Sequence, residues 1–269
     1  MCRNFPLSKF TTIKLGGESK VDFLYEKKDL IKLREKPLIV GGGSNLLVSD
    51  KGVNYAVINR LYGTVETADG FIVNSGERIS TICALAKSRG LGGLEWACGI
   101  PATVGGAIAS NAGAYGNQMS DIVEWVEVYR DGKTQLIANC ECGFSYRRCN
   151  LDGFITQAKI KLYAQEKEQI EKNEKKFRTL RALAQPKGYS AGSIFKQADR
   201  PAWEYVEKVG LKGARIGGAF ISEKHANFII NDGTATASQV YELILLVQKT
   251  VKKQFGINLE REIKLYGEF

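Results

Sequence analysis

The spacing of apolar positions divides the chain into stretches with different secondary structure. Near the start, short apolar runs flank one segment with helical spacing, which predicts a strand–helix–strand opening. The next stretch is rich in alternating, β-branched segments and is interrupted by one helix that ends at Arg89-Gly90. The predicted strands are residues 21–25, 37–40, 55–58, 71–74, 123–129 and 155–162, and the predicted helices are residues 28–35 and 79–88.

Turn and capping residues add detail to this pattern. Asp131-Gly132 stands between alternating segments and predicts a tight hairpin. Thr236 and Gln239 have the spacing of a capping box. Behind them, apolar residues at positions 240, 243, 244, 247 and 251 form one face of a predicted helix. Residues 259–265 are expected to form a terminal strand.

Residues 165–184 form a charged helical segment at which the composition changes from β-branched to Glu- and Lys-rich. We interpret this change as a domain boundary. The sequence therefore predicts an α+β protein of three units, with boundaries at residues 1–54, 55–164 and 165–269. The glycine clusters fall where these units join.

Composition and charge limit the possible functions. The chain has 269 residues, of which 44% are hydrophobic, so wholesale disorder is excluded. The 38 basic and 29 acidic residues give a net charge of +9, which favours anionic ligands. Much of the excess lies at 172–181 and 249–253, in stretches with helical spacing. Solvated helix faces explain most of these lysines better than a nucleic-acid surface does.

The location predicted from the sequence is the cytoplasm. No apolar run approaches the roughly 18 residues of a membrane span. The first residues also lack the apolar stretch of a secretory signal. The protein is accordingly expected to be soluble, without a membrane or nucleic-acid partner.

The cysteines and the single histidine argue against metal and hydrolase chemistry. The chain has 6 cysteines without a Cys-x-x-Cys pair and only one histidine, His225. This set suits a tetrahedral zinc site poorly, and we predict no metal. His225 has no nucleophile-elbow motif to serve, which makes a Ser-His-Asp hydrolase an unfavourable hypothesis. The thiols are expected to be reduced and structural.

Two glycine clusters are the strongest candidates for ligand binding. Gly41, Gly42, Gly43, Ser44 and Asn45 directly follow an apolar strand, and glycine lets successive N–H groups converge on a phosphate. A tight strand-to-loop turn explains this cluster about equally well. Residues 97–116 form an uncharged stretch of mainly small residues, which is costly in chain entropy unless it packs against something extended. Together the clusters suit a dinucleotide, whereas a buried loop with many turns ranks second.

Seven sequence motifs resemble those of one family, the UDP-N-acetylenolpyruvoylglucosamine reductases, which are flavoenzymes of peptidoglycan precursor synthesis. The motifs occur in the order found in that family and extend over nearly the whole chain. The short spacing between Leu162 and Ser193 is similar to that of the family's second structural type. The matching stretches are residues 11–17, 41–47, 99–116, 145–147, 190–196, 224–228 and 259–263. The chain departs from the family at Ala102, where glycine is usual, and at Gln197-Ala198, where Asn-Pro is usual.

The resemblance implies a vanillyl-alcohol-oxidase-type FAD fold in the first two units and a C-terminal α+β substrate domain. It implies FAD and NADPH as cofactors, a UDP-sugar substrate and a role in peptidoglycan synthesis. FAD is expected to be non-covalent, because the only histidine lies away from both glycine clusters, and a monomer is expected. The implied cofactor-binding residues are Gly41, Gly42, Gly43, Ser44, Asn45, Gly99, Ile100, Pro101, Thr103, Gly105, Gly106, Asn111, Gly113 and Gly116.

The resemblance also implies the catalytic residues. Arg147 would bind the substrate carboxylate, Ser193 would protonate the carbon next to it, and Glu262 would assist. The residues alone favour plainer roles: a solvated turn for Arg147, a backbone hydrogen bond for Ser193 and a strand-edge ion pair for Glu262. Tyr146, Arg181 and Lys264 are weaker candidates for substrate contacts.

Two other functions remain open. An FAD-dependent oxidase of the same fold would not need the motifs around Ser193 and Glu262. A phosphate- or nucleic-acid-binding module would use only the positive charge, and it would be colourless when purified.

Overall fold

The computed structural model describes residues 3–33 and 37–269, and its internal contacts group the chain into two compact units. Unit 1 consists of Met1–Asp22, Gly43–Ala56 and Ala184–Phe269, and unit 2 consists of Phe23–Gly42 and Val57–Leu183. The strands β2 (Glu18–Leu24) and β5 (Tyr55–Asn59) each begin in unit 1 and end in unit 2. The chain therefore passes between the units inside strands rather than through flexible linkers.

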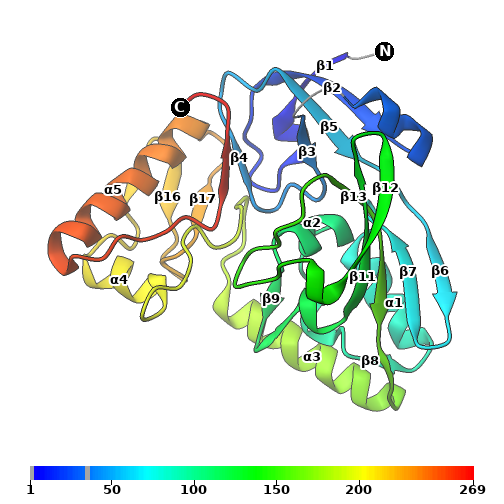
Figure 1. The fold of residues 1–269 in the computed structure, drawn as a ribbon. Helices are drawn as coiled ribbons and strands as arrows, with labels where there is room; N and C mark the ends of the chain where they lie inside the picture. The colour runs from blue at the N-terminus through cyan, green and yellow to red at the C-terminus, as the bar shows by residue number, and fades with distance from the viewer. Residues whose placement is uncertain (1–2, 34–36) are drawn as a thin grey trace. The chain divides into compact units, whose positions relative to one another are not determined.

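Unit 2 is built on a five-stranded antiparallel sheet with the strand order β12-β11-β13-β7-β6 (Figure 1). Asp131 and Gly132 have φ values of 50° and 78°, which confirms the predicted hairpin turn between β11 and β12. Alternate residues of β11 and β13 are buried, as expected for a sheet with one covered face. The strands are β6 (Thr64–Thr67), β7 (Gly70–Asn74), β11 (Val123–Arg130), β12 (Lys133–Ala138) and β13 (Phe154–Lys161).

Helices complete the core of unit 2. The helix α1 (Ile79–Ser88) has the predicted bounds, and Gly90 follows it with a φ of 66°. The buried residues of α1 and of the short helix α2 (Val104–Ala109) pack with β7, β11 and β13 in one apolar cluster. The charged helix α3 (Lys167–Ala184) places Phe177 against the same cluster. The smaller elements are β3 (Leu38–Val40), which lies beside β5, and β8 (Leu91–Gly92), β9 (Gly113–Ala114), β10 (Asn117–Gln118) and β14 (Tyr163–Ala164).

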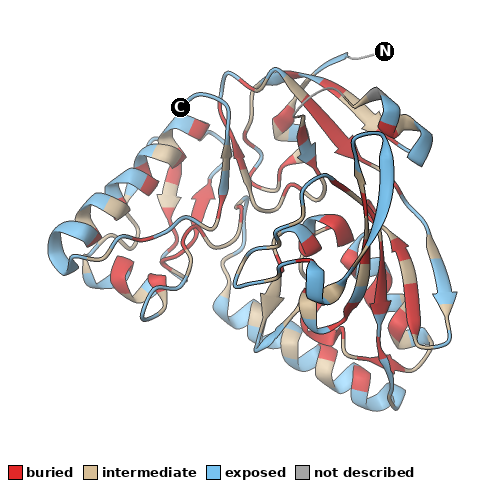
Figure 2. Ribbon diagram, viewed as in Figure 1, coloured by how far each residue is buried: buried red, intermediate tan, exposed pale blue. Residues whose placement is uncertain are grey.

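Unit 1 packs the long helix α5 (Ala237–Phe255) against a small antiparallel sheet, β15-β16-β17. The predicted apolar face is confirmed, because Val240, Leu243, Ile244, Val247 and Val251 are all buried (Figure 2). Parallel pairing of β18 with β4 adds the last residues of the chain to this unit. The remaining elements are β1 (Arg3–Pro6), β4 (Leu46–Val48), α4 (Ala202–Lys208), β15 (Arg215–Ile216), β16 (Ala219–Ile221), β17 (Ile229–Asn231) and β18 (Lys264–Tyr266).

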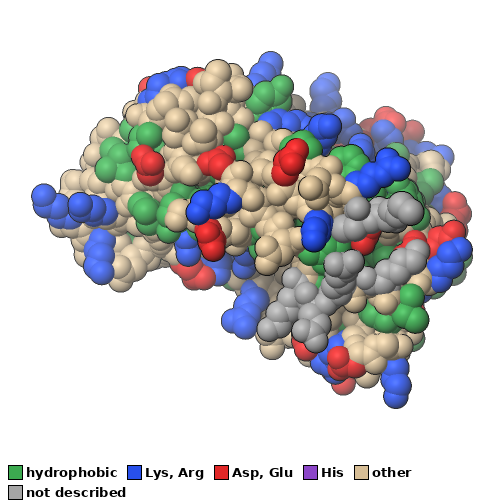
Figure 3. Space-filling model, turned by 90° about the horizontal axis from the view of Figure 1, so that it is seen from above, with side chains coloured by type: hydrophobic (Ala, Val, Ile, Leu, Met, Phe, Trp, Pro, Cys, Tyr) green, Lys and Arg blue, Asp and Glu red, His purple; other side chains and the backbone are tan. Residues whose placement is uncertain are grey.

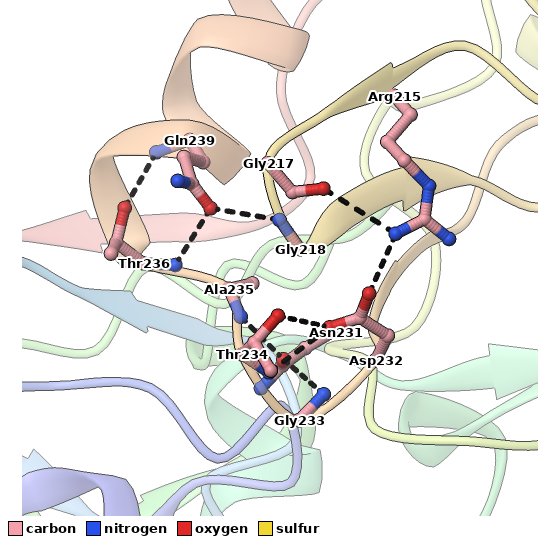
Figure 4. A network of polar contacts seen from close by, with 10 residues as sticks. All are labelled: Arg215, Gly217, Gly218, Asn231, Asp232, Gly233, Thr234, Ala235, Thr236 and Gln239. Carbon is pink, nitrogen blue, oxygen red and sulfur yellow. Dashed lines mark hydrogen bonds and ion pairs between the residues drawn. The ribbon is translucent and has the colours of Figure 1, made fainter.

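The N-terminus of α5 is held by a network of polar side chains (Figure 4). The predicted capping box forms: Gln239 N–H donates to Thr236 Oγ1 over 3.2 Å, and Thr236 N–H donates to Gln239 Oε1 over 3.1 Å. Gln239 Oε1 also accepts from Gly218 N–H, which ties the helix to the β15–β16 turn. Asp50 accepts from the N–H groups of Ala237 and Ser238, and a carboxylate there is favoured by the helix dipole.

The two compact units differ from the three predicted segments. Residues 23–42 of the first segment belong to unit 2, and the rest of that segment belongs to unit 1. The helix α3 was predicted to open the third segment, yet all but its last residue lies in unit 2, because Ile170, Glu174 and Phe177 face the core there. The compact units therefore divide the chain at other residues than the change in composition near residue 165, and a functional boundary there stays a prediction. The expected roles of the three segments, FAD binding by the first two and substrate binding by the third, stay predictions.

Two elements of the structure cover other residues than the sequence predicts. Residues 27–32 form a 3-10 helix instead of an α-helix, and the end of the predicted range, at residues 34–35, lies outside the described residues. The terminal strand begins only at Lys264, since residues 260–262 instead hydrogen-bond to residues 194–196. The stretch at residues 97–116, for which a buried loop was the second-ranked interpretation, contains α2 and β9 and ends in the turn before β10.

The described residues include no helix that is long and apolar enough to cross a membrane. On the face of the molecule seen in Figure 3, Lys and Arg side chains are interspersed with Asp and Glu side chains. This arrangement agrees with solvated charged faces better than with one continuous basic surface.

Candidate cofactor and active site

The two predicted glycine loops meet within unit 2. A Cβ atom on Gly41 would collide with Thr103 Oγ1, and a Cβ atom on Gly42 would collide with Pro101 O and lie 3.0 Å from Ala102 Cα. The Gly42 backbone therefore touches the backbone of the second loop at a position where only glycine fits, and Gly41 lies against the Thr103 side chain. The structure brings together Gly41, Gly42, Pro101 and Thr103 as the sequence predicted.

The first glycine loop has N–H groups available for a ligand. Within residues 3–33 and 37–269, the N–H groups of Gly42, Gly43 and Ser44 donate to no backbone carbonyl. Gly43 has a φ of 63° and is packed against Phe10 O, so its conformation requires glycine. Consecutive N–H donors around a left-handed residue form the arrangement that binds phosphate oxygens.

The N-terminus of α2, in contrast, is already satisfied by the protein. Val104 N–H donates to Glu77 O over 2.8 Å, and Gly105 N–H donates to Ser75 O over 2.9 Å. Gly106 N–H donates to the capping hydroxyl of Thr103. A Cβ atom on Gly105 would lie 2.7 Å from Ser75 Cβ. The structure thus gives Gly105 a role in close packing, and cofactor contacts of Gly105 and Gly106 stay a prediction.

The end of the second glycine stretch is a hairpin. Tyr115 and Gly116 have φ values of 56° and 84° and form the turn between β9 and β10. A Cβ atom on Gly116 would meet nothing within 4 Å, whereas one on Gly113 would lie 2.6 Å from Asn117 O. The hairpin by itself accounts for these glycines, and their contact with a cofactor stays a prediction.

Arg181 lies over the start of the second glycine loop. A Cβ atom on Gly99 would lie 3.3 Å from Arg181 Cδ, and Gly99 has a φ of 91°. Burial lowers the pKa of Arg181, which remains a cation at neutral pH. One turn earlier on α3, Phe177 stacks on Tyr115 with ring centroids 5.2 Å apart. The helix α3 therefore covers part of the glycine-rich stretch, which sequence reasoning did not anticipate.

The loop that carries Arg147 is a tight turn with its guanidinium directed to the protein. Ser145 and Arg148 exchange backbone hydrogen bonds, and Arg147 has a φ of 56°. Arg147 Nη1 donates to Gly113 O over 2.9 Å, and its guanidinium lies 5.3 Å from the centre of the Tyr146 ring. Arg148 is exposed. The structure thus directs Arg147 to the protein and Arg148 to solvent, and it places Tyr146 beside Arg147.

Asn111 supports this loop from inside the unit. Its side chain is buried, donates to Ser145 O and Gln118 Oε1 over 3.1 Å each, and accepts from Ser120 N–H over 3.0 Å. The structure therefore assigns Asn111 a role in holding the Arg147 loop. Its predicted contact with the cofactor stays a prediction.

Ser193 and Glu262 lie on neighbouring backbone segments of unit 1. Glu262 N–H donates to Ile194 O over 2.8 Å, and Ile194 N–H donates to Asn227 O over 2.9 Å. Both Ser193 and Glu262 are partly exposed. The motifs at residues 190–196, 224–228 and 259–263 thus converge in unit 1.

Asn45 joins the first glycine loop to this cluster. Its side-chain amide donates to Glu262 O over 3.3 Å, and its backbone carbonyl accepts from Lys264 N–H over 3.1 Å. A Cβ atom on Gly192 would lie 3.8 Å from Ser44 O. Gly43, Ser44 and Asn45 therefore lie beside the Ser193 and Glu262 segments, while the Lys264 side chain is exposed.

Sequence reasoning gave no role to Asn227. Its side-chain carbonyl accepts from Phe195 N–H over 2.9 Å, and its amide donates to Phe195 O over 2.8 Å. A buried side chain that satisfies both backbone groups of one residue fixes that residue firmly. The position of Asn227 inside the matching motif 224–228 was the only signal for it in the sequence.

His225 lies among aromatic side chains in unit 1. Its ring packs on Phe228 with centroids 4.9 Å apart, and Nδ1 accepts from Asn227 N–H over 3.3 Å. Burial lowers the pKa of His225 below the ordinary value for histidine. Since Nδ1 must be unprotonated to accept this hydrogen bond, the neutral ring is the form that the fold stabilises.

We expect His225 to make the folded state less stable in acid. The unfolded chain binds the proton more tightly, so the free energy of unfolding falls as the pH drops below about 6.5 and levels off below the folded-state pKa. Replacing His225 with Asn, which keeps an acceptor near the Nδ1 position, should flatten this part of the profile. Urea unfolding between pH 7.5 and 5 measures it. A variant with the wild-type slope would show that other groups cause the acid loss.

The described cysteines are free thiols held mainly in the protein interior. Cys83, Cys98 and Cys142 are buried, Cys149 is half-buried and Cys140 is exposed, while Cys2 lies outside the described residues. Burial raises the pKa of Cys142 to about 11. Cys98 donates to the buried carboxylate of Glu174 over 3.2 Å, which is an interaction of the neutral thiol. The surroundings of Cys142 therefore disfavour its thiolate, the reactive form.

We predict six free thiols and no disulfide. Thiol counting under denaturing, non-reducing conditions should find all six, in agreement with the reduced state that the sequence predicted. In the native protein, Cys140 should be alkylated before the other four described cysteines, because it alone among them is exposed. Peptide mapping by mass spectrometry resolves both points. A disulfide-linked peptide, or alkylation of Cys142 at the rate of Cys140, would contradict the prediction.

Among the residues that the structure describes, no group of three or more His, Cys, Asp or Glu side chains could hold a metal ion.

Comparison with known proteins gives matches over both parts of the chain. Residues 31–137 match a family described as an FAD binding domain. Residues 185–266 match the C-terminal domain of UDP-N-acetylenolpyruvoylglucosamine reductase. The α+β fold class, with an FAD-binding fold followed by a C-terminal domain, is thereby confirmed.

Full-length relatives agree with these matches. The chain is 40% identical to UDP-N-acetylenolpyruvoylglucosamine reductase of Caldanaerobacter subterraneus subsp. tengcongensis, over 98% of this chain and 93% of that protein. It is 39% identical to the enzyme of that name from Thermotoga maritima, over 97% of this chain and 96% of that protein. The crystal structure of the reductase from Thermus caldophilus superposes with a TM-score of 0.89 at 36% identity, covering 99% of each chain.

Proposed function

Because this chain belongs to the UDP-N-acetylenolpyruvoylglucosamine reductase family, we propose that it reduces the enolpyruvyl group of a UDP-sugar with FAD and NADPH. The product would be UDP-N-acetylmuramate, a precursor of peptidoglycan, made in the cytoplasm. Reduction adds a hydride to the terminal carbon of the enolpyruvyl double bond and a proton to the carbon that bears the carboxylate.

One observation carries the proposal. Within unit 1, the glycine loop lies against the segments of both candidate proton-transfer residues: Asn45 binds Glu262 O, and Gly192 lies near Ser44 O. A loop with free phosphate-binding N–H groups and a pair of side chains able to deliver a proton are therefore parts of one cluster. This combination suits a reductase, whereas an oxidase has no substrate carbon to protonate.

The glycine loops fit FAD. Gly42, Gly43 and Ser44 offer N–H donors for the diphosphate, and the close approach of Gly42 to the Pro101–Ala102 backbone leaves no room for a side chain there. Bound FAD would supply the hydride carrier between NADPH and the substrate. We propose that it binds without a covalent bond, since neutral His225 is engaged by Asn227 N–H and packed on Phe228.

Arg147 is proposed to hold the substrate carboxylate. Its guanidinium is permanently charged and is aimed by Gly113 O and the Tyr146 ring, so it could stabilise the negative charge that develops next to the carboxylate. Tyr146, Arg181 and Lys264 are proposed contacts for the rest of the substrate. Of the two cations, Arg181 has a more defined position than Lys264, because burial and the Gly99 backbone restrict Arg181.

Ser193 is proposed to deliver the proton. An alcohol is a weak acid, so it works only at close range and against a strongly basic carbon. The bonds from Ile194 to Asn227 and Glu262 fix the backbone directly after Ser193, which supports such a positioned donor. Glu262 is proposed to stabilise the developing charge as a hydrogen-bond donor.

An anaerobic experiment tests this function. The purified protein should be yellow, and acid precipitation should release all flavin into the supernatant. NADPH should bleach the bound flavin, and the enolpyruvyl UDP-sugar should restore the colour without oxygen. A colourless protein that binds no added FAD, or a bleached flavin that only oxygen reoxidises, would contradict the proposal.

A further inference from the structure

Thr12 connects the first glycine loop to the Ser193 loop. Its N–H donates to Gly43 O over 3.0 Å, and its hydroxyl donates to Ser190 O over 2.6 Å. The hydroxyl also lies 3.4 Å from Gly43 O. Because a hydroxyl has a single proton, the short contact with Ser190 is the dominant bond. One residue thus holds a backbone carbonyl in each loop.

The segment that carries Thr12 is firmly anchored. Thr11 is buried, and its hydroxyl donates to Leu15 O over 2.8 Å while it accepts from Leu15 N–H over 3.2 Å. Ile13 is fully buried, and its carbonyl accepts from the Asn231 side chain over 2.9 Å. Both neighbours of Thr12 are therefore fixed by the core of unit 1, so Thr12 acts as a rigid attachment point.

Ser193 lies between two sets of anchors. On its C-terminal side, Ile194 N–H is bound by Asn227 O. On its N-terminal side, Tyr189 O accepts from Asn231 N–H, and Ser190 O accepts from Thr12. Among the described residues, Thr12 thus supplies the hydrogen bond nearest before Gly192, which turns the chain directly before Ser193 with a φ of 76°. Without this anchor, the turn has fewer restraints at the point where the Ser193 hydroxyl is aimed.

We propose that Thr12 is a positioning residue that fixes the Ser193 hydroxyl relative to the glycine loop. The inference rests on the proposed function, in which Ser193 delivers a proton and the glycine loop holds FAD. Thr12 acts through the backbone of Ser190 and exchanges no proton with the substrate. Its side chain should therefore affect only the step in which the substrate carbon is protonated.

The decisive variant is Thr12→Val, which keeps the shape of the side chain and removes the hydroxyl. Its N–H bond to Gly43 stays, so FAD affinity and the rate of flavin bleaching by NADPH should remain within about twofold of wild type. Reoxidation by the enolpyruvyl UDP-sugar should slow by about 10- to 100-fold, the range expected for a misplaced reacting group. Thr12→Ser, which restores the hydroxyl, should recover most of the rate.

Solvent isotope effects separate positioning from damage to the fold. If the donor is misplaced, proton transfer limits reoxidation more strongly, so the slowing in D₂O should be larger in Thr12→Val than in wild type. Thr250→Val is the matched control, because Thr250 also donates to a backbone carbonyl in unit 1, at 2.8 Å, but on α5. The control should leave both half-reactions and the isotope effect unchanged.

These measurements distinguish failure of the proposed role of Thr12 from failure of the proposed function. Equal loss in both half-reactions, or a wild-type reoxidation rate in Thr12→Val, would overturn the role of Thr12 and leave the proposed function intact. Failure of wild-type protein to be reoxidised by the substrate would instead overturn the proposed function. If Thr12→Val does not fold, Thr12→Ala is compared. If neither variant folds, hydrogen exchange of the amides of residues 188–196 is measured in the wild-type protein. Exchange should slow when FAD binds, and unchanged exchange would reject the proposed connection between the glycine loop and the Ser193 loop.

Discussion

Ser193→Ala is expected to bind FAD, to be bleached by NADPH at the wild-type rate and then to stall when the enolpyruvyl substrate is added. The hydroxyl is required only when the substrate carbon takes up its proton. Loss of a positioned proton donor costs about 10²–10⁴ in rate, and more where water cannot replace it. Anaerobic stopped-flow absorbance at the flavin band measures the two half-reactions separately.

Matched variants make this test specific. Ser193→Cys keeps a proton donor in place and should recover part of the turnover. Glu262→Gln should slow the same half-reaction, but less severely, if Glu262 acts as a hydrogen-bond donor. Reoxidation of Ser193→Ala at the wild-type rate would show that the serine assignment is wrong. Glu262, Tyr146 or an ordered water would then have to supply the proton.

Gly42→Val is expected to abolish FAD binding. The first added atom, Cβ, collides with Pro101 O and comes within 3.0 Å of Ala102 Cα. Both are backbone atoms of the second glycine loop, so neither can turn away as a flexible side chain could. One loop must therefore move, and the N–H groups of Gly42, Gly43 and Ser44 would lose their alignment. Fluorescence titration of flavin-free protein with FAD gives the affinity.

The same reasoning makes a sharper statement about Gly42→Ala. Since the collision is at Cβ, alanine should weaken FAD binding nearly as much as valine does. Gly132→Ala is the control, because Gly132 lies in the β11–β12 turn with nothing within 4 Å of its added Cβ. It should lower thermal stability through its φ of 78° and leave FAD affinity unchanged. Full FAD affinity in Gly42→Ala would rule out close approach as the reason for glycine at this position.

Local signals in the sequence determined most of the regular elements. The helix at residues 79–88, the turn at Asp131-Gly132 and the capped helix after Thr236 were all predictable, because apolar spacing, turn residues and caps act within a few positions. The family resemblance likewise depended on short motifs. Each motif could be read alone, and their order along the chain needed no structure.

The tertiary structure decided how these segments associate. The pairing of β18 with β4 and the bonds from Asn45 to Glu262 and from Thr12 to Ser190 join residues far apart in the chain. The same holds for the division of residues 1–54 between two units and for the place of α3 in unit 2. Apolar spacing shows which face of an element is buried but not which distant segment covers it, because many partners bury equal area. Direct backbone contacts and specific hydrogen bonds select one partner, and they exist only once the chain has folded.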